Sequence, residues 1–257
     1  MSSLEHLLSI FHGYDSALLA YSGGIDSTLL LELLRTRVDA RWRAVFVDHP
    51  ALTEGERLAA RAAIKDVQGQ VLVATLTEMQ PVWGGQRHDR CYHCKKYLFG
   101  KLVCLAKEMR LAVVIDGSHA DDDPGRRPGM RALAELGIES PLRRAGWGKA
   151  LIRRQAREMG VESWNRPARA CLAVGIDGLV TGGKLALMKK LENFFQQHAI
   201  SPARFRLEAN GRLDIAVTAA DDQRVREMLS LSAFRQLLAE SGVEQVGCST
   251  LVGGAVR

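Results

Sequence analysis

Two features of the chain combine residue types that could do chemistry. The run SGGIDS at 22–27 joins two glycines to two hydroxyls and a carboxylate, and five cysteines are spread over the 257 residues. Hydroxyls and backbone amides beside glycines are suited to holding phosphate, whereas cysteines supply nucleophilic sulfur or bind metals. The sequence therefore directs attention to phosphate binding and to sulfur chemistry.

The SGGIDS run lies between an apolar stretch at 17–21 and a periodic apolar stretch, which predicts a strand, a loop and a helix. At such a junction, backbone N–H groups and the positive helix end can cradle a pyrophosphate. Glycines let the main chain approach the anion, hydroxyls can donate to its oxygens, and the aspartate can bind magnesium or cap the helix. The run lacks the lysine of a Walker loop. We therefore predict a pyrophosphate-binding loop made of Ser22, Gly23, Gly24, Asp26 and Ser27, with Asp26 as a magnesium ligand.

Cys91 and Cys94 form a C-x-x-C pair at the end of a loop predicted from Trp83 to Cys94, at the entry of a helix predicted from about 95 to 109. The positive end of a helix favours thiolate, and hence metal binding or nucleophilic use. A structural zinc would need two more ligands, from His88, His93 or a remote residue. Cys171 lies in the basic segment RPARACLA, which again favours thiolate, although a small buried hydrophobe is the alternative interpretation.

Three cysteines that meet in one site would suit an iron–sulfur cluster with one open iron, or a persulfide relay. Of the other two cysteines, Cys104 is flanked by apolar residues and is predicted to lie in the core, and Cys248 carries no readable signal. Five is an odd number of cysteines, which argues against a secreted disulfide framework.

The composition is that of a globular protein, with 47% hydrophobic residues and a net charge of +6. This charge suits a nucleotide or a nucleic acid, although a basic solvated surface explains it equally well. No apolar run approaches the roughly 20 residues that a membrane span needs. The N-terminus lacks a basic region followed by a cleavage site. We therefore expect a cytoplasmic protein without a membrane partner.

The elements that must position these residues alternate between strand and helix. Strands are predicted at 17–21, 42–48, 70–76 and 111–117, and this alternation predicts a parallel sheet with helices on both faces. Asp116 and Gly117 lie at the carboxyl end of the last of these strands. That position suits nucleotide or magnesium binding, although an Asp-Gly turn has the same signature.

The chain changes character near Gly183, where we place a boundary between a domain at 1–182 and a domain at 183–257. Two alternating stretches surround Asn210-Gly211, the strongest short signal of a β-hairpin. Helical patterns and a short strand near Val246 follow. The tail is therefore expected to be a small α+β domain.

The SGGIDS run resembles the signature of the PP-loop pyrophosphatase superfamily at all five specified positions. The resemblance implies the adenine nucleotide alpha hydrolase-like fold of the HUP type. It also implies ATP and magnesium as cofactors, with ATP cleaved between its α and β phosphates so that AMP is left on an acceptor oxygen. Because the superfamily includes several synthetases and tRNA thiolases, the loop alone does not identify the acceptor.

Further stretches narrow the resemblance to the LarE family, the sulfur transferases of nickel-pincer nucleotide biosynthesis. After SGGIDS they are RCYHCKKYLF, DGSHADDDPGRRPGMRALAELGIESPL, the K-x-x-I-R that begins at Lys149, and RPARACLA. The resemblance implies a small nucleotide substrate, pyridinium-3,5-biscarboxylic acid mononucleotide. Its carboxylate would be adenylated and converted to a thiocarboxylate. A homo-oligomer is implied as well.

In one branch of that family the sulfur comes from the enzyme's own cysteine, and Cys171 matches this residue. A three-cysteine branch instead holds an iron–sulfur cluster that carries an extra sulfide, and Cys91, Cys94 and Cys171 resemble that set. We favour the cluster, because the sacrifice of one cysteine does not require the C-x-x-C pair.

Arginines of this chain resemble the family's anion-binding residues. Arg204 and Arg206 resemble paired arginines that meet the substrate phosphate, with a solvated strand face as the alternative, and Arg127 could clamp a phosphate. The chain also departs from the family, which usually continues C-L-A-S-R after the sulfur cysteine. Val174 and Gly175 stand at the last two positions. A guanidinium is thereby lost beside the cysteine, which leaves the acceptor open.

Two other functions stay open. A PP-loop tRNA thiolase would normally need an RNA-binding appendage, and no basic stripe interleaved with aromatic residues is present, so nucleic acid is not an expected partner. The second alternative is a non-catalytic protein that binds a nucleotide, which the altered segment after Cys171 suggests.

Overall fold

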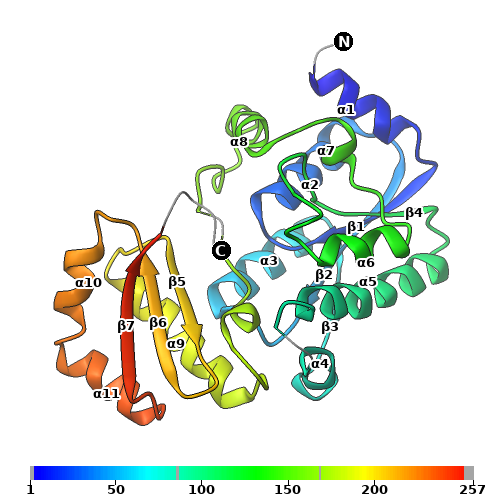
Figure 1. Cartoon of the computed structure of the whole chain (residues 1–257). Helices are drawn as coiled ribbons and strands as arrows, with labels where there is room; N and C mark the ends of the chain where they lie inside the picture. The colour runs from blue at the N-terminus through cyan, green and yellow to red at the C-terminus, as the bar shows by residue number, and fades with distance from the viewer. Residues whose placement is uncertain (1–2, 85–86, 168, 252–257) are drawn as a thin grey trace. The chain divides into compact units, whose positions relative to one another are not determined.

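The computed structural model of the protein describes residues 3–84, 87–167 and 169–251. Contacts divide the chain into two compact units, each with its own sheet (Figure 1). The first unit comprises 1–49, 54–75 and 91–166, and the second comprises 50–53, 76–90 and 167–257. The domain boundary near Gly183 stays a prediction.

The first unit contains four parallel strands in the order β3, β2, β1, β4. In the register, Leu19 of β1 lies opposite Ala44 of β2 and Ile115 of β4. The α/β class with a parallel sheet is confirmed, because strands and helices alternate as parallel crossovers require. The strands are β1 (Ser16–Tyr21), β2 (Arg41–Asp48), β3 (Gln70–Val73) and β4 (Val113–Ile115).

Helices flank this sheet and complete its core. Leu18 and Val45 of the sheet pack with Leu102 and Ala106 of α5 in a buried cluster. In α2, five leucines are buried, as expected of a helix covered on several sides. The helices are α1 (Ser3–His12), α2 (Ile25–Arg37), α3 (Glu54–Asp66), α5 (Arg90–Glu108), α6 (Gly129–Glu135), α7 (Pro141–Arg144) and α8 (Lys149–Glu158).

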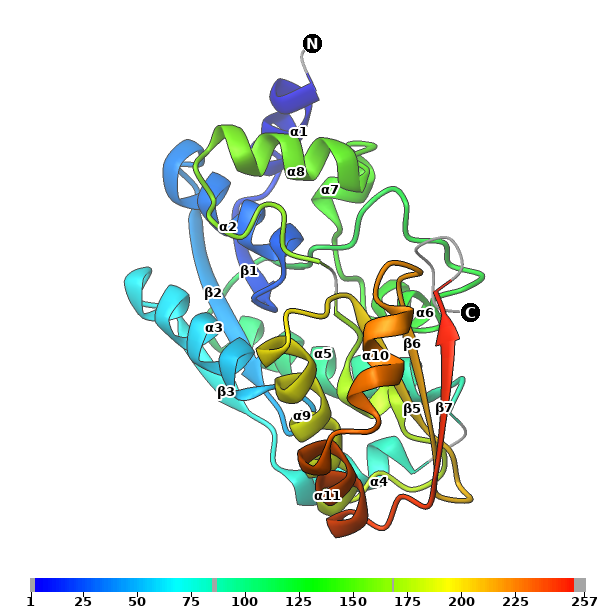
Figure 2. The same ribbon diagram turned by 90° about the vertical axis from the view of Figure 1, so that its left-hand side faces the viewer.

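The second unit contains a three-stranded sheet in the order β5, β6, β7. The predicted hairpin at Asn210-Gly211 is confirmed: it joins antiparallel β5 and β6, and Gly211 has a φ of +86°. Figure 2 shows α9, α10 and α11 gathered on one face of this sheet, where Phe195 packs against Phe205 and Phe234. The elements are α4 (Leu76–Trp83), η1 (Leu172–Gly175), α9 (Gly182–Gln197), β5 (Ala203–Leu207), β6 (Arg212–Val217), α10 (Asp222–Met228), α11 (Ser232–Glu240) and β7 (Gln245–Thr250).

Two local predictions are wrong. The stretch from Trp83 to Cys94, predicted as a loop, includes the end of α4 and the start of α5, which begins at Arg90. Pro81 lies inside α4, and a proline normally indicates a break rather than a helix. The third strand also ends at Val73 rather than 76, because the chain continues directly into α4.

Among the described residues, no helix is both long and apolar enough to cross a membrane. The 19-residue α5 illustrates why, because it carries Lys95, Lys96 and Lys101.

Candidate functional site

The SGGIDS loop lies at the point where the order of the strands reverses. β2 and β3 follow β1 on one side, and β4 lies on its other side, which is where open parallel sheets bind ligands. Gly117, just after β4, lies against the loop: a Cβ there would be 3.0 Å from the Ser27 amide nitrogen and 3.1 Å from Cβ of Asp26. The segment after β4 and the start of α2 thus lie against each other.

Hydroxyl groups hold the loop in shape. The Oγ atoms of Ser22 and Ser27 are 3.0 Å apart, and Ser27 Oγ donates to the Gly24 carbonyl at 3.0 Å. Gly23 has a φ of +76°, which a residue with a side chain rarely adopts. No side chain caps α2 at Gly24, so the amides of its first turn face the loop as an anion site would require.

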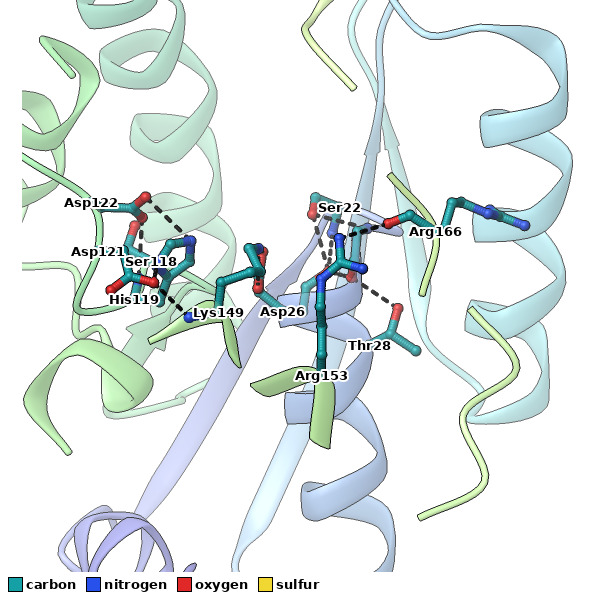
Figure 3. A network of polar contacts seen from close by, with 12 residues as sticks. Ser22, Asp26, Thr28, Ser118, His119, Asp121, Asp122, Lys149, Arg153 and Arg166 are labelled. Carbon is teal, nitrogen blue, oxygen red and sulfur yellow. Dashed lines mark hydrogen bonds and ion pairs between the residues drawn. The ribbon is translucent and has the colours of Figure 1, made fainter. Parts of the chain in front are cut away.

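An ion pair joins Asp26 to Lys149, the first residue of α8. Lys149 Nζ lies 2.6 Å and 2.7 Å from the two carboxylate oxygens (Figure 3). Asp121 fixes the same helix, because its carboxylate accepts the Lys149 backbone N–H at 2.6 Å. A remote helix thus places an ammonium group beside the glycine loop, which carries no lysine of its own. The sequence showed Lys149 only as part of the K-x-x-I-R stretch.

The acidic run at 121–123 is not a solvated loop throughout. Asp122 is only 3% exposed, and its Oδ1 pairs with Arg127 Nη1 at 2.6 Å and His119 Nε2 at 3.3 Å. Burial lowers the pKa of His119, although the Asp122 carboxylate opposes this shift. Arg127, predicted to clamp a phosphate, uses its guanidinium on Asp122, so its phosphate role stays a prediction.

Asp116 is buried at the carboxyl end of β4. It accepts hydrogen bonds from the hydroxyls of Ser118 at 2.5 Å and Ser140 at 2.6 Å, and from the Ser118 amide at 3.1 Å. Lys95 Nζ lies 3.8 Å from its Oδ2. The amide contact two residues on is the Asx turn expected as the alternative to ligand binding. A nucleotide role for Asp116 stays a prediction.

Sequence reasoning missed a charged group beside the loop. Asp48, at the carboxyl end of β2, accepts hydrogen bonds from Arg57 at 2.8 Å and Arg61 at 2.6 Å. Both arginines lie on α3, whose Ala60 would be 3.2 Å from a Cβ at Gly23. The spacing of the arginines at i and i+4 was a possible signal, because it places them on one helix face.

Both C-x-x-C cysteines lie at the start of α5, three residues apart, and both are partly exposed. The helix N-terminus expected at this pair is confirmed. Within the described ranges, no three or more His, Cys, Asp or Glu side chains are grouped as a metal site. A cluster at Cys91, Cys94 and Cys171, and magnesium at Asp26, stay predictions. Cys104 was predicted to lie in the core. This prediction is wrong, because Cys104 of α5 is exposed.

The second unit has a cavity of about 480 Å³ that contains Cys171. Arg204, Arg206 and Asp214 line it from the sheet face opposite the helices, as strand alternation requires. Burial lowers the pKa of Arg204, while Glu192 opposes the shift. Cys171 is exposed just before η1. The structure thus brings together the cysteine and both predicted phosphate-binding arginines.

Cys248 also borders this cavity, but its side chain belongs to the other sheet face. In the register it pairs with Ile215, which is fully buried under the helices. Burial raises the pKa of the Cys248 thiol above its ordinary value. The charge of Arg226 on α10 lowers this pKa, and the charge of Asp222 on the same helix raises it. Cys248 therefore does not share the environment of Cys171.

A buried arginine organises the segment after Cys171. Arg90 is 1% exposed and donates to the carbonyls of Ala173 at 2.7 Å, Ile176 at 2.5 Å and Gly178 at 2.7 Å. Its Nε donates to the carbonyl of Trp83 at 3.1 Å. A planar guanidinium is well suited to several carbonyls at once. Arg90 stood in the sequence beside Cys91, and no sequence pattern revealed this function.

The glycine loop between a buried strand and a helix, next to the carboxyl end of β4, defines an α/β protein with the PP-loop fold. No protein-family model matches the chain. It is similar to an uncharacterized protein of Synechocystis, with 32% identity over 81% of this chain and 79% of that protein. It is 26% identical to pyridinium-3,5-bisthiocarboxylic acid mononucleotide synthase of Lactiplantibacillus plantarum, over 87% of this chain and 84% of the synthase. An uncharacterized Methanocaldococcus jannaschii protein is 29% identical over 74% of this chain and 73% of its own. The chain belongs to the LarE family.

Proposed function

We propose that this protein is an ATP-dependent sulfur transferase that forms AMP and pyrophosphate. Its acceptor would be a carboxylate of pyridinium-3,5-biscarboxylic acid mononucleotide, which becomes a thiocarboxylate. One observation carries the proposal: exposed Cys171 lines the same cavity as Arg204 and Arg206. A thiol beside two guanidiniums suits a reaction between sulfur and an anionic substrate. The similarity to a synthase named for the bisthiocarboxylic acid product supports the same reaction.

The activation step would use the SGGIDS loop. An oxygen of the acceptor carboxylate attacks the α-phosphorus of ATP, the bond to the β-phosphate oxygen breaks, and pyrophosphate leaves with AMP bound to the acceptor. Backbone amides at the start of α2 and the Lys149 ammonium would stabilise the charge on the departing pyrophosphate. Magnesium at Asp26 would supply further charge neutralisation when bound. Gly23 and Gly117 add no Cβ beside the loop, where one would meet Ala60, Asp26 and Ser27.

In the sulfur step, the Cys171 thiolate attacks the acyl carbon and AMP leaves, which gives a thioester. Removal of the Cys171 Cα proton then breaks its Cβ–S bond, which leaves dehydroalanine in the protein and a thiocarboxylate on the product. Alternatively, an iron–sulfur cluster held by Cys91, Cys94 and Cys171 would supply the sulfide when bound. We favour the cluster, because the C-x-x-C pair has no role in the sacrificial route.

The test uses the full chain with ATP, magnesium and the pyridinium dicarboxylate mononucleotide. We expect release of pyrophosphate and AMP, and a thiocarboxylate product by mass spectrometry. Cys171→Ser should keep pyrophosphate release and lose the thiocarboxylate. Absence of pyrophosphate release from the wild type, with ATP bound, would contradict the proposal and favour a non-catalytic relative.

The source of the sulfur is tested separately. Anaerobically purified wild type should contain iron and sulfide, and Cys94→Ala should contain much less, with Cys104→Ala as the matched control. Equal iron and sulfide in all three would refute the cluster. Loss of the mass of hydrogen sulfide from the protein after turnover would then identify the sacrificial route.

A further inference from the structure

A third guanidinium borders the cavity of Cys171. Arg87 lines this cavity, and its Nε donates to the carbonyl of Val174 at 2.8 Å and lies 3.3 Å from Asp177 Oδ1. Both of these contacts use Nε of Arg87, and the side chain borders the cavity. Arg87 is therefore fixed through one nitrogen and can offer its other two as a fork.

The position of Arg87 coincides with the departure from the family pattern. Arg87 donates to the backbone carbonyl of Val174, which stands where the family has a serine. The next residue, Gly175, stands where the family has an arginine. Gly175 has no room for a side chain: a Cβ would be 2.4 Å from the Phe205 carbonyl oxygen and 2.5 Å from Met188 Cε. The chain thus cannot place an arginine at 175 with this backbone, yet a guanidinium reaches the same segment from 87.

Asp177 holds two arginines of this cavity. Its Oδ1 faces Arg87, and its Oδ2 accepts from Arg206 Nε at 3.2 Å and Nη2 at 3.0 Å. A carboxylate is therefore already the partner of both guanidiniums in this structure. The pair Arg87 and Arg206 is suited to carboxylate oxygens, because each fork can donate two parallel hydrogen bonds.

We propose that Arg87 is a substrate-binding residue of the Cys171 cavity and binds a carboxylate of an aromatic dicarboxylate. This inference rests on the proposed function and deepens it. Arg87 is attached to the third residue after Cys171, so a carboxylate in its fork lies on the segment that carries the nucleophile. Arg204, which is more buried than Arg206, would then bind the phosphate. Asp177 positions Arg87 and competes with the ligand for it.

Calorimetry of the full chain without ATP tests the proposal, with pyridine-3,5-dicarboxylate as the probe and inorganic phosphate as the competitor. Arg87→Gln should weaken dicarboxylate binding by about tenfold or more and change phosphate binding less than about twofold, because only one fork is removed. Arg226→Gln is the matched control, since Arg226 lies on α10 and pairs with Asp222 outside the cavity.

Asp177→Asn separates ligand binding from loss of structure. It removes the competing carboxylate and keeps Arg87, so dicarboxylate affinity should rise by roughly threefold to tenfold. Wild-type affinity in Arg87→Gln, or equal loss of dicarboxylate and phosphate binding, would overturn the proposal. Failure here is distinct from failure of the proposed function, because pyrophosphate release and thiocarboxylate formation by the wild type do not depend on which arginine binds the carboxylate.

Discussion

The ammonium group of Lys149 lies between 2.6 and 2.7 Å from both carboxylate oxygens of Asp26. The two residues are 123 positions apart in sequence, and each side chain is less than a third exposed. This pair places a positive charge from α8 over the start of α2, where the loop amides already favour an anion. An ammonium group from α8 and the glycine loop therefore lie together at the start of α2.

Lys149→Met should lower pyrophosphate release by about 100-fold, because one charged group that stabilises the leaving pyrophosphate is removed. Arg154→Met is the control, since Arg154 is an exposed residue of the same helix. The measurement is the rate of pyrophosphate release at saturating ATP and acceptor. Equal rates in both variants would show that Lys149 has only a structural role.

Gly117→Ala should weaken ATP binding by roughly tenfold, because a Cβ at 3.0 Å from the Ser27 amide nitrogen pushes the phosphate loop away. Gly100→Ala is the matched control. It lies inside α5 with nothing within 4 Å of the added Cβ, so it should stabilise the fold by about 0.5–1 kcal/mol. ATP titration and thermal unfolding check both effects. Unchanged ATP affinity in Gly117→Ala would contradict ATP binding at the glycine loop next to β4.

Arg90→Met should destabilise the protein by about 3–5 kcal/mol, because three buried carbonyls and the part-buried carbonyl of Gly178 lose a charged donor. The Cys171 segment should also loosen, so that iodoacetamide alkylates Cys171 faster. Arg235→Met, on the exposed side of α11, should change neither quantity. Urea unfolding and peptide mapping after alkylation are the measurements. A stable Arg90→Met protein with wild-type alkylation would refute this function of Arg90.

Stability at low pH should depend on Asp48. Burial would raise the pKa of Asp48, but hydrogen bonds from Arg61 and Arg57 outweigh it, so the pKa lies below its ordinary value. The resulting stabilisation is therefore present above the ordinary carboxylate pKa of about 3.9 and is lost as the pH falls through the lower folded-state value. Asp48→Asn should be less stable than wild type at pH 7, and the difference should shrink below about pH 4. Urea unfolding at both pH values decides this, and a constant difference would contradict it.

Local patterns predicted the strands, the phosphate loop and the hairpin, because strand alternation and the Asn210-Gly211 signal depend on neighbouring residues. The C-x-x-C pair was correctly placed at the start of a helix for the same reason. α4 was missed, since Pro81 inside it has the signature of a break.

Contacts between distant residues could not be read from spacing. Lys149 and Asp26 meet only because α8 packs on α2. Asp122 is buried against the guanidinium of Arg127 and the imidazole of His119, whereas a run of three aspartates indicates a solvated loop. Arg90 bonds carbonyls, which no side-chain pattern can reveal, because every residue carries one.

The tight packing around Gly175 restricts how this cavity can change over evolutionary time. With Phe205 and Met188 against the glycine, a mutation to arginine at 175 would collide with the scaffold before any benefit appeared. Substitutions at 87, 175 and 188 should therefore depend on one another, so that a variant harmful alone becomes acceptable when its neighbours have changed. Grafting a serine and an arginine into 174 and 175 is expected to fail even with a smaller residue at 188, unless the Phe205 backbone also moves away from position 175.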